Sequence, residues 1–400
     1  MSEDNREVLL KVEHLSQYFK MGNKELKAVD DVSFDIKKGE VFGLVGESGC
    51  GKTTTGRSII KIYDITSGNI YFKGQRIAAG TRSYKDEIKA CQKELKNVND
   101  SAKRAELQEK IGKYREEIKK AVNDQRNSDK EYAQKLVKDI TAKYDELLAK
   151  EKDSAEIKKL KAKRADELRI AKHTRLITKI QMIFQDPIAS LNPRMTVREI
   201  IAEGMVINGI KDKKYIDEKV YSILETVGLV REHAGRYPHE FSGGQRQRIG
   251  IARSVVMQPD LLIADEPVSA LDVSIQAQVI NLLNDLRNEL GLTILFVAHD
   301  LSVVKYFSDR IGVMYFGKMV ELATSDELFA HPLHPYTKSL LSAIPLPDPK
   351  SEKTRTRIVY NKETAHDYST DKPTMREVAP GHFVYCNDAE EKQYKKELES

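Results

Sequence analysis

The chain has 400 residues, enough for one large domain or two ordinary ones with a sizeable core. Its 66 Lys and Arg residues against 61 Asp and Glu residues give a formal charge of +5, milder than a dedicated nucleic-acid-binding protein usually carries. The three cysteines, Cys50, Cys91 and Cys386, lie far apart, which excludes a disulfide framework and a paired metal-ligand spacing and favours a reducing interior.

Two strands are expected near the start of the chain, at residues 8–15 and 32–36, where apolar and polar side chains alternate. Between them lie two adjacent aromatic residues, Tyr18 and Phe19. One of these rings could stack on an adenine, or both could be ordinary packing on a β-surface. Spacing alone leaves both interpretations open.

A phosphate-binding loop is predicted within residues 41–55. A short apolar run, typical of a buried strand, leads into a match to G-x-x-x-x-G-K-[ST]. In this pattern glycines let backbone N–H groups surround a phosphate, the lysine adds a positive charge, and the threonine hydroxyl reaches Mg2+. A helix expected over residues 54–62 would point its positive end at the same anion. The chain is therefore predicted to bind a nucleoside triphosphate through Gly46, Ser48, Gly49, Cys50, Gly51, Lys52 and Thr53.

A charged segment follows another short strand expected at residues 69–73. Lys, Glu, Asp and Ala dominate residues 84–172, and apolar positions recur there at intervals of three and four, the heptad rhythm. A polar stretch at residues 123–130 is interpreted as a turn, which predicts an antiparallel helical hairpin projecting from the nucleotide-binding domain. The alternative is a long, partly frayed solvated helix or a disordered insert.

Apolar strands return at residues 180–186, 260–266 and 293–298. Asp265 suits an outer-sphere position at a Mg2+ ion held by Thr53, and Glu266 could orient an attacking water or accept its proton. A merely acidic turn is the alternative for this pair taken alone. His299 follows the third strand, where open α/β sheets bind ligands, although a lone histidine there is more often structural.

A predominantly helical region is expected at residues 196–227, between the first two of these strands. It is followed by Ser242, Gly243 and Gly244, which could cap and open a helix whose first N–H groups are free to bind an anion. Ser and Gly are common at helix starts, so this feature is unspecific by itself.

Four motifs in this order resemble the ATP-binding subunits of ABC transporters. They are the phosphate loop, FSGGQRQR at 241–248, DLLIADE at 260–266 and SALD at 269–272, and the resemblance covers residues 1–345 apart from the insert. Longer segments are similar to the oligopeptide/dipeptide importer ATPases, and most of all to their F-type subunit. These segments are MIFQDPIASLNPRMTV at 182–197, YPHEFSGGQRQRIGIAR at 237–253, HPLHPYTKSLLSAIP at 331–345 and APGHFVYC at 379–386.

The resemblance implies an α/β fold. We expect a P-loop NTPase core of the ABC type, with a mixed sheet and an antiparallel β subdomain, a helical subdomain and the inserted hairpin. The expected divisions are residues 1–80 and 175–325 for the nucleotide-binding domain, with its helical subdomain at 194–257, residues 81–174 for the insert, and 326–400 for a C-terminal extension.

The resemblance also implies roles for individual residues. Phe19 would stack on the adenine, with Tyr18 as a neighbouring candidate, and Thr54 would join the residues that hold the phosphates. Gln185 would touch Mg2+ or the attacking water and report on the membrane subunits. Glu266 would be the catalytic carboxylate, and His299 would contact the γ-phosphate.

Other implied roles concern the metal and a second subunit, because the family sandwiches each ATP between two such domains. The metal site would consist of Thr53, Gln185 and Asp265. The residues expected to complete the site of the facing subunit, or to lie at the seam, are Ser242, Gly243, Gly244, Gln245 and Asp272.

The implied function is ATP hydrolysis that powers the uptake of oligopeptides or dipeptides, at the cytoplasmic face of the cell membrane. No apolar run approaches the roughly 18 residues of a membrane span, and residues 1–10 lack a signal-peptide pattern. The implied partners are two permease subunits, a second and probably sister ATPase, and indirectly an extracellular peptide-binding protein, with no nucleic acid. With Cys386 as the single tail cysteine, an iron–sulfur cluster is not expected.

The alternative function is that of a soluble ABC ATPase acting on chromosomes or ribosomes. Chromosome-associated relatives also carry a coiled coil between the phosphate loop and the signature sequence. Their arms are far longer than residues 84–172, and translation-factor relatives carry two nucleotide-binding domains in one chain.

Overall fold

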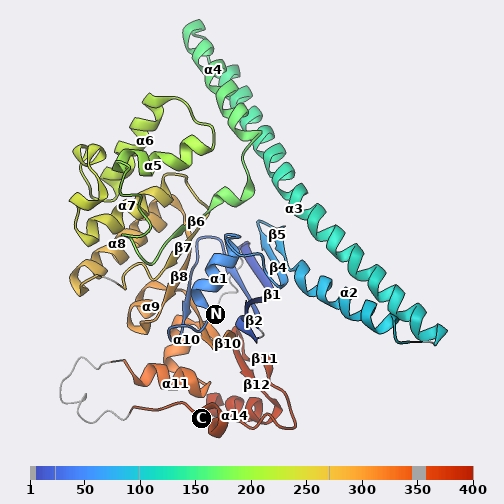
Figure 1. Ribbon diagram of the computed structural model, residues 1–400. Coiled ribbons are helices and arrows are strands. Elements are labelled where there is room, and N and C mark those ends of the chain that lie inside the picture. Colours follow the sequence, from blue (N-terminus) through green and yellow to red (C-terminus); the bar gives the residue numbers. More distant parts are fainter. Residues whose placement is uncertain (1–5, 23, 99, 270, 345–356, 400) are drawn as a thin grey trace, which may run out of the picture.

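The computed structural model describes residues 6–22, 24–98, 100–269, 271–344 and 357–399 (Figure 1). The expectations that involve Ala270 and Pro345 lie outside these residues. The first sheet is antiparallel, with four strands in the order β2-β1-β4-β5. Its strands are β1 (Val8–Met21), β2 (Lys24–Lys37), β4 (Ser67–Phe72) and β5 (Gln75–Ala79).

A second, mixed sheet carries eight strands in the order β11-β12-β10-β9-β3-β8-β7-β6. Strands β9, β3, β8, β7 and β6 run parallel to one another, whereas β10 pairs antiparallel with β9, β12 with β10, and β11 with β12. Every residue of β3, β7 and β8 is buried, because elements cover both faces of the sheet. The strands are β3 (Val41–Val45), β6 (Ile180–Ile183), β7 (Leu261–Asp265), β8 (Thr293–Ala298), β9 (Arg310–Tyr315), β10 (Lys318–Thr324), β11 (Thr374–Ala379) and β12 (His382–Cys386).

Helices cover the mixed sheet, and the two sheets share a core. One apolar cluster joins the mixed sheet to the helices beyond it, and a second lies between the two sheets. The helices outside the insert are α1 (Lys52–Ile59), α5 (Val197–Ile207), α6 (Lys213–Thr226), α7 (Gly243–Val255), α8 (Val273–Leu290), α9 (Leu301–Phe307), α10 (Ser325–Ala330), α11 (Pro335–Ser342), α13 (Lys362–Ala365) and α14 (Asp388–Glu399), with short 3-10 helices η1 (Leu176–Lys179), η2 (Arg231–Gly235) and η3 (Pro238–Glu240). This arrangement confirms the expected α/β class with mixed and antiparallel sheets.

The insert differs from the predicted hairpin. It consists of α2 (Thr81–Leu95), α3 (Ser101–Lys150) and α4 (Ser154–Ala171), and α3 runs without interruption through residues 123–130. The turn expected there is therefore wrong. Figure 1 shows α2 and α4 folded back against opposite ends of α3, which makes two short hairpins with one shared helix. None of the helices within the described ranges is long and apolar enough to cross a membrane.

The real turns have cap signals in the sequence. Asp100 accepts a hydrogen bond from the backbone N–H of Ala102 at 3.1 Å, and Asp153 does the same for Ala155 at 2.9 Å. Each aspartate therefore satisfies a free N–H group at the start of a helix. An N-cap residue followed by a periodic segment is the pattern that predicts these two helix starts.

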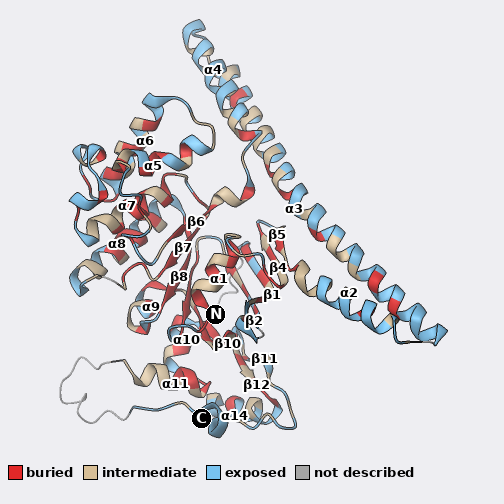
Figure 2. Cartoon of the chain, viewed as in Figure 1, coloured by how far each residue is buried: buried red, intermediate tan, exposed pale blue. Residues whose placement is uncertain are grey.

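The polar stretch of α3 lies against the nucleotide-binding domain. Asp124 pairs with Arg76 on β5, and Asp129 accepts a hydrogen bond from the N–H of Leu176 at 3.0 Å. Tyr132, one turn further, is 7% exposed and packs into the cluster between the sheets. The apolar stripe is interrupted at residues 123–130 because this part of the helix contacts polar groups of the domain rather than another helix. Figure 2 shows the scarcity of buried residues along the rest of α3.

Tyr132 is therefore expected to stabilise the whole domain. Substitution of Tyr132 by Ala should lower the free energy of unfolding by about 3–5 kcal/mol, because it removes a large side chain from the core. Urea unfolding of the full chain would measure this. The control is Tyr114→Ala, since Tyr114 packs in the apolar cluster of the outer α2–α3 hairpin, with its ring centroid 5.8 Å from that of Tyr84. Equal effects of the two substitutions would show that the middle of α3 is not part of the core.

The C-terminal region, here residues 325–344 and 357–399, adds β11 and β12 to the mixed sheet. It is held by Glu321 of β10, whose fully buried carboxylate accepts hydrogen bonds from the N–H groups of Leu333 (2.8 Å) and His334 (3.0 Å). The same carboxylate lies 2.8 Å from Nε2 of His382 on β12. Burial, together with the neighbouring His366, lowers the pKa of His334 to about 3.

The lowered pKa of His334 predicts acid sensitivity. The unfolded chain takes up a proton at this residue near its ordinary pKa of about 6.5, while the folded chain does not until about pH 3. Stability at this residue is therefore lost as the pH falls through that window, by about 2 kcal/mol at pH 5. His334→Asn keeps an acceptor for the Tyr336 N–H and removes the titration. Its Tm should fall less between pH 7 and pH 5 than that of the wild-type chain, and equal slopes would contradict the assignment.

Candidate active site

The phosphate loop connects the end of β3 to the start of α1. A Cβ atom on Gly46 would lie 2.2 Å from the carbonyl oxygen of Met314, and one on Gly51 would lie 2.2 Å from that of Ala28. Both glycines also have positive φ angles, 147° and 106°, which other residues rarely adopt. Only glycine fits at these two positions, because the loop is pressed against the mixed sheet at one end and against β2 at the other.

Lys52 begins α1 and is 4% exposed. Its ammonium group donates hydrogen bonds to the carbonyl oxygens of Gly46 (2.7 Å) and Glu47 (3.0 Å). No side chain caps the start of α1, so its first N–H groups face the loop without a side-chain acceptor. Together these groups make a compact positive site for an anion. The other loop residues predicted to hold phosphate, Ser48, Gly49, Cys50, Thr53 and Thr54, lie in the same loop and first turn.

Thr53 and Asp265 are in contact, as a shared metal site requires. The Thr53 hydroxyl donates a hydrogen bond to Oδ1 of Asp265 at 2.8 Å, and Asp265 is fully buried at the end of β7. Its second oxygen, Oδ2, has no hydrogen-bond partner among the described residues. Burial raises the pKa of Asp265, partly offset by the Thr53 hydroxyl and by Arg57. A buried carboxylate oxygen without a partner beside a hydroxyl fits a hard divalent cation.

Glu266 brings the other predicted catalytic residues together. Its Oε2 accepts a hydrogen bond from the side-chain amide of Gln185 at 3.0 Å and lies 3.2 Å from Nδ1 of His299. The backbone of Glu266 has a positive φ angle of 44°, and its N–H donates to the carbonyl oxygen of Val297 at 2.9 Å. The three residues follow β7, β6 and β8, whose carboxyl ends meet because these strands are parallel.

The two aromatic candidates have different surroundings. The hydroxyl of Tyr18 donates a hydrogen bond to Asp30, and the Lys27 ammonium lies 5.1 Å from the centre of its ring. Phe19 is half-buried and meets the ring of Tyr63 edge to face, with centroids 5.1 Å apart. Tyr18 is thus occupied by polar contacts within the first sheet, and Phe19 stays the better candidate for stacking.

The signature residues form a helix start of their own. Ser242 caps α7: its hydroxyl accepts from the N–H of Gln245 at 3.3 Å, and its own N–H donates to the Gln245 side chain at 3.1 Å. A Cβ on Gly244 would lie 2.7 Å from a methyl group of Ile275, whose N–H is capped in turn by Asp272 at 3.0 Å. Among the described residues no hydrogen bond joins Ser242, Gly243, Gly244, Gln245 or Asp272 to the phosphate loop of the same chain.

One contact of the loop was not predicted. The hydroxyl of Tyr336 on α11 accepts a hydrogen bond from the N–H of Glu47 at 3.0 Å. In the sequence, the segment around Tyr336 carries family resemblance, and nothing in its local pattern indicates that it reaches the phosphate loop.

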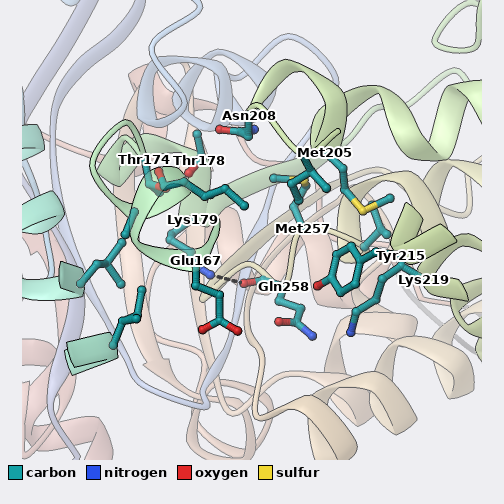
Figure 3. Close-up of a pocket in the computed structure, with 16 residues that line it drawn as sticks. Glu167, Thr174, Thr178, Lys179, Met205, Asn208, Tyr215, Lys219, Met257 and Gln258 are labelled. Carbon is teal, nitrogen blue, oxygen red and sulfur yellow. Dashed lines mark hydrogen bonds between the residues drawn. The ribbon is translucent and has the colours of Figure 1, made fainter. Parts of the chain in front are cut away.

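A cavity of about 290 Å³ lies elsewhere, between the insert and the helical layer (Figure 3). Residues of α3 and α4 line it on one side, and Met205, Tyr215 and Met257 line it from the helical side. None of the predicted site residues borders this cavity. It is therefore separate from the group formed by Lys52, Asp265 and Glu266.

Two family models match the chain. The family model described as ABC transporter matches residues 29–146 and 135–269, two segments that meet within α3. The model for the oligopeptide/dipeptide transporter C-terminal region matches residues 320–372.

Full-length relatives and solved structures are also similar. The oligopeptide transport ATP-binding protein OppF of Bacillus subtilis is 48% identical over 97% of this chain and 99% of its own length. The dipeptide transport ATP-binding protein DppF of Lactococcus lactis is 44% identical over 97% of both chains. The ATP-binding cassette MJ0796, solved as a dimer bound to ADP and Pi, has a TM-score of 0.51 at 22% identity, over 79% of this chain and 99% of its own, which shows the fold alone. The chain therefore belongs to the ABC transporter family and is an ATP-binding protein of its oligopeptide/dipeptide transporter group.

Proposed function

We propose that this chain hydrolyses ATP to power the import of oligopeptides or dipeptides through partner permease subunits. The observation that carries the chemistry is the position of Glu266, whose carboxylate contacts Gln185 and His299. These three side chains and the phosphate loop lie at the same edge of the mixed sheet. Hydrolysis of a bound triphosphate needs this arrangement. The names of the relatives support peptides as the cargo.

The phosphate loop binds the triphosphate, and Lys52 changes partner as it does so. Its ammonium is held by two carbonyl oxygens of the loop, so it is already buried beside the phosphate position. Phosphate oxygens offer an anionic partner in place of these neutral ones, which adds charge–charge attraction to the hydrogen bonds of the ammonium group. The role of Phe19 is to stack on the adenine.

A Mg2+ ion fits beside Thr53, Asp265 and Gln185, and when bound it would neutralise charge on the phosphate oxygens. Thr53 offers its hydroxyl, and the buried carboxylate of Asp265 holds that hydroxyl in place. The side-chain amide oxygen of Gln185 remains for the ion or the water, because its amide nitrogen donates to Glu266.

Glu266 is the group that orients the attacking water and accepts its proton. Gln185 and His299 both contact one oxygen of the carboxylate, Oε2, which leaves Oε1 for the water. The side chain of His299 is 53% exposed, so it is accessible to a bound γ-phosphate. General-base assistance of this kind contributes typically about 10²–10⁴-fold to a rate.

A second ATPase subunit would complete the site. Ser242 and Gly243 are exposed at the start of α7 and are not joined to the phosphate loop of their own chain. The facing subunit is a sister chain by resemblance. The γ-phosphate of the ATP bound to that subunit could accept hydrogen bonds from these N–H groups, and Asp272 would lie at the interface between the two subunits. ATP then favours the closed pair because it contacts both halves, and closure is passed through the Gln185 region to two permeases.

The subunit is placed at the cytoplasmic face of the membrane, with an extracellular peptide-binding protein as an indirect partner. The test is a native pull-down of the tagged chain from gently solubilised membranes, using Glu266→Gln with ATP to hold the closed state. Recovery of two polytopic permeases and a second ATPase is expected. Recovery of ribosomes or DNA from the soluble fraction, without a membrane partner, would instead favour the soluble ATPase. The domain divisions at residues 80, 174 and 325 stay predictions.

A further inference from the structure

The C-terminal region reaches the phosphate loop through a buried tyrosine. Tyr336, in the first turn of α11, is 1% exposed, and its hydroxyl accepts a hydrogen bond from the N–H of Glu47. The carbonyl oxygen of Glu47 accepts a hydrogen bond from the Lys52 ammonium. Glu47 is therefore held through its N–H by the C-terminal region and through its carbonyl by the lysine that would bind phosphate.

Packing fixes where the Tyr336 hydroxyl lies. Its ring is 4.4 Å from that of Tyr315, at the end of β9, and 5.6 Å from that of Tyr360, measured between centroids. Strand β9 is the parallel neighbour of β3, which leads into the loop. A large aromatic ring enclosed in this way has little rotational freedom, so the hydroxyl presents a fixed acceptor to the loop.

The start of α11 is anchored by a second set of buried contacts. Glu321 accepts hydrogen bonds from the N–H groups of Leu333 and His334, and His334 accepts one from the N–H of Tyr336 at 3.1 Å. His382 on β12 contacts the same carboxylate. A continuous line of contacts thus runs from the C-terminal strand through β10 and the start of α11 to Glu47. Figure 2 shows buried residues at this position on α11.

The phosphate loop needs such support before an anion arrives. A phosphate-binding loop gathers backbone N–H groups around one anion, and without that anion the ligand does not hold the loop in this conformation. Met314 and Ala28 confine the two glycines at the ends of the loop, while Ser48 and Gly49 between them are exposed. Fixing Glu47 in advance lowers the conformational cost that ATP binding must otherwise offset.

We propose that Tyr336 is a positioning residue for ATP binding: its hydroxyl fixes the Glu47 peptide group and so holds the phosphate loop ready before the nucleotide binds. Tyr336 acts through the loop and touches neither the nucleotide nor the attacking water. The C-terminal region, in this view, takes part in forming the nucleotide site as well as completing the mixed sheet.

The test is Tyr336→Phe in the full chain, with Tyr360→Phe as the matched control. Tyr360 belongs to the same group of rings, and its hydroxyl makes no hydrogen bond to another described residue. For Tyr336→Phe the Kd and KM for ATP should rise about three- to tenfold, as expected for one lost hydrogen bond. The kcat should stay within about twofold, because the residue does not touch the reacting atoms. Tyr360→Phe should leave all three values within about twofold of wild type, which is less than a lost hydrogen bond costs.

A second variant tests the anchor. Glu321→Gln weakens the contacts that hold the start of α11, so it should also raise the Kd for ATP. If Glu321 acts through Tyr336, the double variant Tyr336→Phe/Glu321→Gln should bind ATP as tightly as Tyr336→Phe alone. Unchanged Kd and KM in Tyr336→Phe would overturn the proposal. Equal losses of ATP affinity in Tyr336→Phe and Tyr360→Phe would also overturn the proposal. The same holds for a Kd of Tyr336→Phe that returns to the wild-type value well below the Tm of the variant. Either result would mean that the ring packing, and not the hydroxyl, supports ATP binding.

Discussion

Substitution of Glu266 by Gln is expected to lower kcat for ATP hydrolysis by about 10²–10⁴-fold while ATP stays bound. Glutamine has nearly the same shape, so the contacts to Gln185 and His299 can be kept through its amide oxygen. The substitution removes the carboxylate that, in the proposed mechanism, orients the water and accepts its proton. Because the proposed function assigns ATP binding to the phosphate loop and not to Glu266, the Kd for ATP should change little, and the variant should trap ATP.

Single-turnover hydrolysis and ATP binding by the purified full chain, or by its complex with the partner subunits, would measure these two quantities. The matched control is Glu289→Gln, on an exposed face of α8, which should behave as wild type. Full ATPase activity in Glu266→Gln would refute the assignment of Glu266. A variant that neither binds nor hydrolyses ATP would show instead that Glu266 supports the structure of the loop.

Much of the nucleotide site could be predicted because its chemistry sets the spacing. Gly46, Gly51 and Lys52 have to lie a few residues apart to surround one phosphate, and the structure shows why side chains are excluded at both glycines. Glu266 and His299 could be placed at one sheet edge because each follows a predominantly apolar run, the mark of a buried parallel strand. Local pattern and tertiary structure agree at these positions.

The rest depended on contacts between distant segments. The polar residues at 123–130 are compatible with a turn or with a helix that lies on a polar surface, and only Arg76 and Leu176, far away in the sequence, decide between them. Tyr336 contacts Glu47 although the two residues are 289 positions apart in the sequence. Periodicity describes which face of an element is buried, but not which element buries it.

These contacts also change the interpretation of the insert. The B. subtilis relative aligns over nearly the whole of both chains, so it has a segment opposite the insert. Since the middle of α3 contributes Tyr132 to the core, the insert is anchored in the nucleotide-binding domain and does not hang from a surface loop. Only the two outer hairpins extend beyond the domain.

Substitution of Asp265 by Asn is expected to separate activity from stability. The buried carboxylate has one oxygen bonded to Thr53 and one without a partner among the described residues, and burial raises its pKa. A carboxyl group with a raised folded-state pKa lowers stability as the pH rises above its unfolded pKa of about 3.9, so the cost is present at pH 7. The Asn variant avoids that cost, and its Tm without nucleotide and Mg2+ should equal or exceed that of wild type.

The ATPase activity of Asp265→Asn should nevertheless fall, by about 10–100-fold, because a neutral amide cannot support a divalent cation beside Thr53 as a carboxylate does. Measurements of Tm without ligands and of ATPase activity over a Mg2+ titration would test both halves of this prediction. Asp285→Asn on exposed α8 is the control and should change neither. A lower Tm together with normal activity would reverse the assignment, since Asp265 would then be a structural carboxylate that the folded chain needs. A higher Tm with lost activity would identify Asp265 as a residue kept ionised for the metal at a cost to the stability of the fold.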